Sequence, residues 1–249
     1  PPLLFRYNFR FNQWPMPAAQ NRKLYLHSSG GLSFEAPNNG QAYSEYVSDP
    51  AKPVPSSEIE GEMSGFTPFL YMSEDQRFAA TRPDVLVFET QALTEDMVLG
   101  GEITVNLQVS TSGTDADWMV KLIDVYPDNE PNHDYLPNPR VTMGGYQQMV
   151  RSEIMRSRFR NSFERPEPMT PDAVTPITFR LQDVLHTFKK GHRLMVQVQS
   201  TCFPLFDRNP QKFVPNIFLA NEADFIKATQ RVYHAPGQAS HLEVQVLPY

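Results

Sequence analysis

The sequence predicts an all-β protein, a jelly-roll β-sandwich with long Pro-rich loops and a few short surface helices. Twenty-three prolines against 12 glycines in 249 residues, together with many short apolar runs, favour strands joined by ordered loops over a helical bundle. Residues 102–111 alternate aliphatic and polar side chains, which is the period of a strand with one buried face. A chain of this length can bury a core without a disulfide or a metal ion, so we expect a single domain over residues 1–249.

The expected elements follow from the same signals along the chain. Strands are predicted at residues 23–27, 32–35, 85–90, 102–111, 118–126, 177–181, 191–200 and 242–246. Residues 46–55 contain three prolines and are expected to be extended, because each proline keeps the preceding residue out of the helical region. Residues 146–163 fit both the helical and the strand period, and the alternation of Arg156, Arg158 and Arg160 favours a strand over the second half. Residues 183–190 and 221–229 are predicted as short surface helices.

Composition excludes some functions and leaves the compartment open. The formal net charge of −6 gives no general attraction to nucleic acid or to anionic membranes. No apolar stretch approaches the roughly 18 residues of a membrane-spanning helix. Cys202 is the only cysteine, so it cannot form an internal disulfide, and a buried apolar role is expected for it. The first residues do not resemble a signal peptide and lack an initiator methionine, so we expect a piece of a longer polypeptide, periplasmic, secreted or cytoplasmic.

The sequence contains no motif that is typical of a serine hydrolase. An α/β-hydrolase carries its nucleophile in a G-x-S-x-G turn between a strand and a helix, and the nearest match, GEMSG at residues 61–65, places Ser64 one position late. The six histidines have no spacing typical of a zinc site, and His192 is expected to make a turn hydrogen bond. We therefore predict no catalytic, cofactor-binding or metal-binding residue.

Three aspartates, Asp115, Asp117 and Asp124, lie close together in sequence and raise the question of a calcium site. The EF-hand pattern fails, because neither the glycine at its sixth position nor the closing glutamate is present. Pairing with Arg156, Arg158 and Arg160 is the preferred interpretation. If these charges form a ladder of exposed ion pairs on the sheet, each pair stabilises the fold by only about a few tenths of a kcal/mol.

A carbohydrate-binding module is the alternative function. Exposed aromatic side chains on one concave face would mark such a module, and Trp14, Trp118 and ten tyrosines are available. Trp118, however, lies in the apolar stretch WMVKLIDVY, so packing in the core is the stronger expectation.

Several segments in order resemble one protein family. They are GHRLMVQVQSTCFPLFDRNP at 191–210, KLYLHSSGGLSFEAP at 23–37 with YVSDPAKPVP at 46–55, EDQRFAATRPDVLVFET at 74–90, STSGTDADWMVKLIDVYPD at 110–128, and GGYQQMVRSEIMRSRFRNSF at 144–163. Together they resemble the C-terminal jelly-roll domain of the family of X-prolyl dipeptidyl peptidases, cocaine esterases and α-amino-acid ester hydrolases. The GGYQ and R-x-R-F-R stretches look most similar to the ester hydrolases and the glutaryl-cephalosporin acylases.

The resemblance implies a non-catalytic domain that follows an α/β-hydrolase core. In that family the Ser-Asp-His triad lies on the core, so this chain alone should hydrolyse nothing and should need no cofactor. The implied parent is a serine hydrolase acting on α-amino-acid esters, amides or X-Pro peptides. The implied partners are the catalytic domain of the same polypeptide, reached through a lead-in at residues 1–22, and further copies in a homo-oligomer.

The resemblance also suggests where the domain meets the active-site mouth. Residues 59–76 show neither a helical nor a strand period, and in cocaine esterase the corresponding region looks like part of the wall of the acyl pocket. The side chains singled out for contact with the catalytic domain are Phe66, Phe69, Leu70 and Tyr71.

Overall fold

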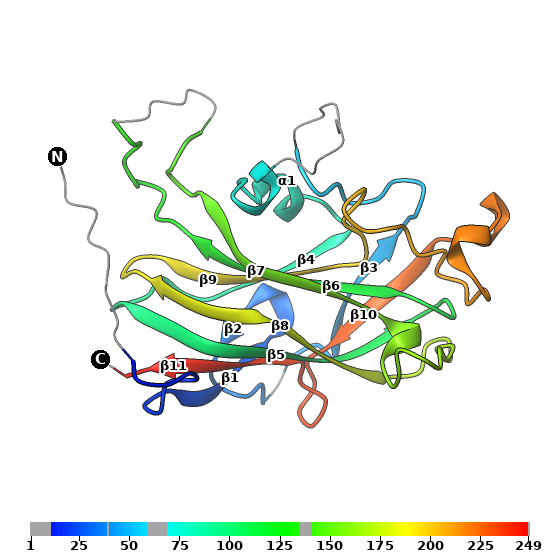
Figure 1. Cartoon of the computed structure of the whole chain (residues 1–249), viewed down its shortest axis with the longest axis horizontal. Coiled ribbons are helices and arrows are strands. Elements are labelled where there is room, and N and C mark those ends of the chain that lie inside the picture. Colours follow the sequence, from blue (N-terminus) through cyan, green and yellow to red (C-terminus); the bar gives the residue numbers. More distant parts are fainter. Residues whose placement is uncertain (1–10, 39, 59–68, 135–140, 249) are drawn as a thin grey trace.

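The chain forms two antiparallel β-sheets that face each other in a computed structural model (Figure 1). The structure describes residues 11–38, 40–58, 69–134 and 141–248. The predicted all-β sandwich is therefore confirmed.

The first sheet is built around one long strand. Its members are β1 (Gln20–Leu26), β2 (Leu32–Ser33), β3 (Tyr43–Ser48), β5 (Met97–Thr111), β8 (Thr175–Phe188), β10 (Ala228–Tyr233) and β11 (His241–Leu247). Strand β5 pairs with β8 along one edge and with both β11 and β10 along the other. A bulge at Gly101, where φ is 141°, shifts the register with β8. Glycine is favoured there because L side chains rarely adopt a φ of this value.

The second sheet has the strand order β4 (Val85–Glu89), β9 (Arg193–Gln199), β6 (Asp117–Val125) and β7 (Gln147–Arg156). Every residue of β6 is buried, so both faces of this sheet are covered. One face packs on the first sheet. The other lies beneath the short helix α1 (Arg77–Ala80), which Figure 1 places outside the sandwich. This outer layer positions the candidate site described below.

The core lies between the two sheets and is almost entirely aliphatic and aromatic. Its fully buried members include Leu24, Leu26, Phe88, Leu99, Ile103, Val105, Leu107, Trp118, Val120, Leu122, Phe188, Leu194, Val196, Val198, Val232 and Leu242. Burial of each such side chain stabilises the fold by about 1.5–3 kcal/mol. Trp118 is 0% exposed and its indole Nε1 donates to Oγ of Ser157 at 2.8 Å, so its predicted core role is confirmed.

The helices of the described residues are short and peripheral. Besides α1 they are the 3₁₀ helices η1 (Ser28–Gly30), η2 (Phe69–Met72), η3 (Ser157–Phe159), η4 (Ile217–Leu219) and η5 (Glu222–Asp224). None of the helices in the described parts of the chain has the length and apolar character that crossing a membrane requires.

Four local predictions are wrong at least in part. The segment predicted as a helix at residues 183–190 forms the end of strand β8 instead, because the first residues of β5, before the bulge, pair with β8 as far as Phe188. Only η5 forms at 221–229, and strand β10 begins at Ala228. The strand predicted in the second half of 146–163 occupies the first half instead, as β7. The segment 46–55 is interrupted by a turn in which Lys52 N donates to the carbonyl of Asp49.

Candidate interdomain site

The segment predicted to line an active-site mouth is described only in its second half. Residues 59–68, with Phe66, lie outside the described residues. The helix η2 (Phe69–Met72) follows. Within it Tyr71 is half-buried, and Met72 is 53% exposed, which is high for an apolar side chain. The contact role assigned to these residues stays a prediction.

A surface pocket of about 400 Å³ opens beside η2. Tyr71 and Met72 form one wall, and residues 149–152 of β7 form the other. Arg151 in that wall is held in place, because its Nε donates to the backbone carbonyl of Asp183 at 2.7 Å. The pocket thus combines apolar side chains with one fixed cation at the protein surface.

Hydrogen bonds tie the segment after η2 to the start of β7. The Asp75 carboxylate accepts from the backbone N–H of Arg77 at 3.1 Å and of Gln147 at 3.3 Å. Nε of Arg77 donates back to Asp75 at 2.7 Å. The hydroxyl of Tyr146 donates to the backbone carbonyl of Ser73. These bonds fix the position of η2 relative to the sheet.

A buried lysine lies beneath this segment. Lys121 is 1% exposed on the outer face of β6, and its Nζ donates to Oε1 of Gln76 at 2.8 Å. Burial lowers the pKa of Lys121 and raises that of the neighbouring Cys202 thiol, because desolvation penalises the charged form of each group. Cys202 is 2% exposed, as predicted. Sequence reasoning missed Lys121, although a single lysine within an apolar strand was the available signal.

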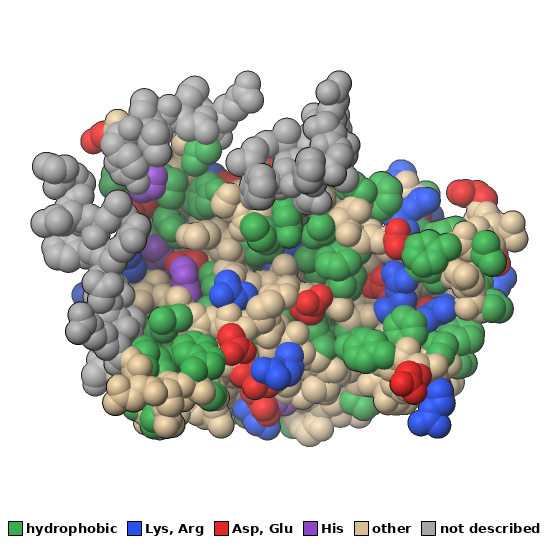
Figure 2. Space-filling view, viewed as in Figure 1, with side chains coloured by type: hydrophobic (Ala, Val, Ile, Leu, Met, Phe, Trp, Pro, Cys, Tyr) green, Lys and Arg blue, Asp and Glu red, His purple; other side chains and the backbone are tan. Residues whose placement is uncertain are grey.

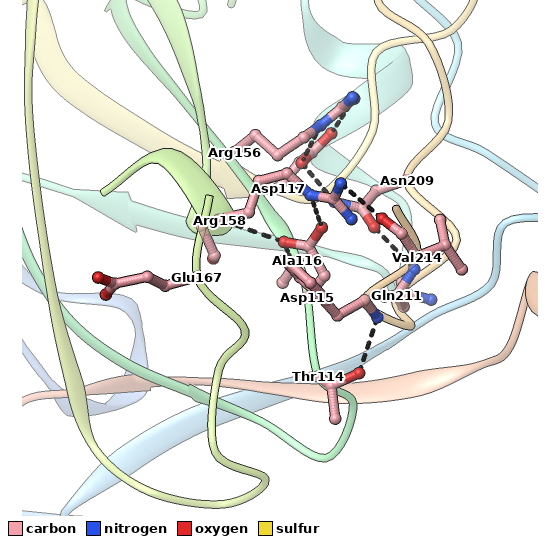
Figure 3. A network of polar contacts seen from close by, with 12 residues as sticks. Thr114, Asp115, Ala116, Asp117, Arg156, Arg158, Glu167, Asn209, Gln211 and Val214 are labelled. Carbon is pink, nitrogen blue, oxygen red and sulfur yellow. Dashed lines mark hydrogen bonds and ion pairs between the residues drawn. The ribbon is translucent and has the colours of Figure 1, made fainter. Parts of the chain in front are cut away.

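Two ion pairs close the end of the second sheet, where β6 begins (Figure 3). Nε of Arg158 donates to Oδ2 of Asp115 at 2.6 Å, and Arg156 bonds both carboxylate oxygens of Asp117 at 2.9 Å. Asn209 donates to the same Asp117 carboxylate at 2.7 Å. Burial raises the pKa of Asp117, and the bonds from Arg156 and Asn209 oppose that rise.

The predicted pairing of these charges is confirmed for two arginines, and the pair of Arg158 is buried rather than exposed. The Arg158 and Asp115 side chains are 4% and 0% exposed. Arg158 also donates to the carbonyl of Val214 at 2.9 Å and lies 4.6 Å from the ring of Phe213. Removing one partner of a buried pair of this kind is far more destabilising than breaking an exposed pair, because it leaves a buried charge without its counter-charge. Arg160 instead lies 3.8 Å from Glu167.

Asp124 binds two histidines rather than an arginine. Nδ1 of His192 and Nε2 of His186 each lie 2.8 Å from one of its carboxylate oxygens. Burial alone would raise the pKa of Asp124, but the hydrogen bonds from the two rings outweigh it and lower the pKa. The turn hydrogen bond predicted for His192 is present, since its backbone N–H donates to the carbonyl of Lys189 at 3.0 Å. The contact of its ring with Asp124 was not anticipated, and neither was that of His186. Among the described residues, no three His, Cys, Asp or Glu side chains are placed to hold a metal ion.

Two serine hydroxyls contact a histidine ring, and neither pair forms a catalytic relay. Oγ of Ser44 lies 2.8 Å from Nε2 of His234, whose second ring nitrogen has no hydrogen-bond partner in the described structure. Oγ of Ser33 lies 2.9 Å from Nε2 of His27, which also contacts the backbone carbonyl of Glu35. Each pair lacks the carboxylate that orients the imidazole of a serine hydrolase. Ser64 lies outside the described residues.

Residues 8–243 match the model of one protein family, described as the X-Pro dipeptidyl-peptidase C-terminal non-catalytic domain. A curated relative is the cocaine esterase of Rhodococcus sp. (strain MB1 Bresler), which is 27% identical over 248 residues. That alignment covers 94% of this chain and 39% of the esterase.

Two solved structures share the fold at much higher sequence identity. An aminopeptidase from the marine sediment archaeon Thaumarchaeota archaeon is 44% identical with a TM-score of 0.89, over 96% of this chain and 39% of that one. An α-amino acid ester hydrolase is 47% identical with a TM-score of 0.84, over 91% of this chain and 36% of that one. This chain thus spans less than two fifths of the length of each of these relatives.

Proposed function

Because this chain belongs to the family of X-Pro dipeptidyl-peptidase C-terminal non-catalytic domains, we propose that it serves a larger serine hydrolase whose chemistry resides on another domain. That domain is an α/β-hydrolase core in the same polypeptide, and it forms and hydrolyses a seryl ester. Within the described residues, the pairs of Ser44 with His234 and of Ser33 with His27 lack a carboxylate partner, which supports placing the triad elsewhere.

The relatives suggest the substrate class of the whole enzyme. The two structures with more than 40% identity are an aminopeptidase and an α-amino acid ester hydrolase. We infer that the parent of this chain acts on esters, amides or X-Pro peptides of α-amino acids. Assembly of the parent into a homo-oligomer is part of the same proposal.

The single observation that supports a role at the active-site mouth is that η2 carries an exposed apolar side chain and is anchored to the sheet by hydrogen bonds. Met72 is 53% exposed, yet the residues just after it are bonded to β7 through Asp75 and Tyr146. An apolar side chain held at the surface on a fixed support is typical of a contact site for another domain or a ligand. In this proposal Phe66, Phe69, Leu70 and Tyr71 contribute to the same wall.

Alanine substitutions in the full-length parent test this role. The double variants Phe69→Ala/Leu70→Ala and Tyr71→Ala/Met72→Ala should lower kcat/KM for bulky acyl groups by about tenfold to a hundredfold, since losing one apolar pocket contact has effects of that size. Small acyl groups should be affected less. Val47→Ala is the matched control, because Val47 is 54% exposed but lies on β3 of the other sheet. Unchanged kcat/KM for every ester and X-Pro substrate in both double variants would refute the proposal.

A further inference from the structure

A second pocket, of about 320 Å³, lies at the other end of β7 and takes no part in the proposed mouth. Its apolar lining is formed by Ile154, Met155, Phe159, Phe163, Leu205 and Phe206. Its volume and its apolar walls are those of a site for a small ligand. In Figure 2 hydrophobic side chains are interspersed with charged ones at the right-hand end of the molecule, where Figure 1 draws the orange segment that contains η4.

The aromatic part of this pocket is unusually exposed. Phe163 is 77% exposed, and its ring stacks on that of Phe159 with centroids 6.2 Å apart and 29° between the ring planes. Burial of the Phe163 ring therefore contributes little to the stability of the fold. A ligand ring placed against it would cover apolar surface that is now in water.

The polar part of the pocket is fixed at its base and charged at its rim. Nε and Nη2 of Arg156 bind Asp117, and Nη2 also donates to the backbone carbonyl of Asp207 at 3.2 Å. Asp117 is 1% exposed and receives a further bond from Asn209, so the guanidinium cannot swing away without leaving a buried charge unpaired. The bonds to described residues use Nε and Nη2, which leaves the N–H groups of Nη1 to donate to a ligand.

The charges decide which kind of ligand fits. Asp117, Arg156 and Asp207 line the pocket together, and two carboxylates against one guanidinium leave one negative charge. A carboxylate ligand is therefore disfavoured, while an ammonium group gains a partner in Asp207, which is exposed at the rim. A neutral carbonyl can accept from Arg156, and an aromatic side chain can cover Phe163.

We propose that this pocket binds compounds that carry a free ammonium group, a neutral carbonyl and an aromatic side chain, as in an aromatic α-amino amide or a peptide with an aromatic N-terminal residue. Both sources present the same recognition chemistry. The site lies on this chain and needs no catalytic domain, so the proposal is independent of the function proposed above.

Binding of phenylalaninamide to the 249-residue chain, followed by NMR shifts or calorimetry, tests the proposal, because the core between the two sheets lies within this chain. We expect saturable binding with a Kd of about 1–10 mM, as for a ligand of this size. N-acetylphenylalaninamide, which lacks the ammonium group, and glycinamide, which lacks the ring, should bind at least tenfold more weakly. The tripeptide Phe-Gly-Gly as its amide should bind as well as phenylalaninamide if peptides are the source and less well if small amides are.

Three variants locate the site. Phe163→Ala and Asp207→Asn should each weaken phenylalaninamide binding at least fivefold, and both alter exposed side chains, so the thermal midpoint should be kept. Phe218→Ala is the matched control, since Phe218 is 76% exposed on η4 but does not line the pocket; binding should be unchanged. No saturable binding, equal binding in the first two variants and the native chain, or tighter binding of 3-phenylpropionate than of phenylalaninamide would overturn the proposal.

Discussion

Asp115→Asn should lower the free energy of unfolding by about 3–5 kcal/mol, because it leaves the Arg158 guanidinium buried without its counter-charge. The two side chains are 0% and 4% exposed, and the atoms that bond them are 2.6 Å apart. At that distance the attraction is about 6 kcal/mol for an effective dielectric constant of about 20. The amide oxygen of asparagine recovers part of this, and Val214 and Phe213 still hold the guanidinium, so the loss should stay below the full attraction.

Urea unfolding followed by tryptophan fluorescence measures the effect. Trp118 is fully buried and bonded to Ser157, next to Arg158 in sequence, so its emission reports on this region. Glu102→Gln is the matched control, since it breaks an ion pair with Arg180 in which both side chains are 40% or more exposed; it should cost less than about 1 kcal/mol. If Asp115→Asn costs no more than this control, the buried pair does not hold the end of the sheet as described.

Two further predictions concern other buried polar groups. Burial lowers the pKa of His234 to about 4, whereas an unfolded histidine has a pKa of about 6.5. Between pH 4 and 6.5 the unfolded state therefore binds more protons than the folded state. About 2–3 kcal/mol of stability that is present above pH 6.5 should be lost as the pH falls to 4. His234→Gln should flatten the stability curve measured by urea unfolding over that window, and an unchanged slope would show that other groups cause it. Lys121→Met should lower the free energy of unfolding by about 1–3 kcal/mol, because it leaves Oε1 of the buried Gln76 without a donor, and hydrogen exchange at α1 should become faster for the same reason. A loss above about 3 kcal/mol would instead indicate a charged, paired lysine.

Strand prediction succeeded where the apolar side chains of a strand are frequent, whether one face is buried, as in β5, or both are, as in β6. Strand β5 alternates between buried and half-buried residues over 102–109 and was predicted at residues 102–111, although its first residues, from Met97, were not included. Strand β10 was missed because it contains Gln230, which is 0% exposed and bonds Gln211 at 2.6 Å. A buried glutamine looks like a surface residue in sequence, and only a partner from a distant loop makes its burial possible.

The candidate sites were predictable only in outline. Complementary charges suggested that Arg156 and Arg158 pair with Asp117 and Asp115, but the burial of these pairs depends on the loops that cover them. The contact of Asp124 with His192 joins residues 68 apart in sequence and follows from the register in which Asp124 lies opposite Leu194. Such a register is set by the packing of whole sheets, so a single sequence does not reveal it.

The division of labour between this chain and a separate catalytic domain is tested most directly by labelling with a fluorophosphonate, which reacts with activated serines. The full-length parent and the 249-residue chain would be treated in parallel, and the labelled peptide identified by mass spectrometry. The parent should be labelled at one serine outside these 249 residues and should hydrolyse phenylglycine methyl ester, while the chain alone should show neither label nor turnover. Label on a serine of this chain, together with ester hydrolysis by the chain alone, would contradict its assignment as a non-catalytic domain.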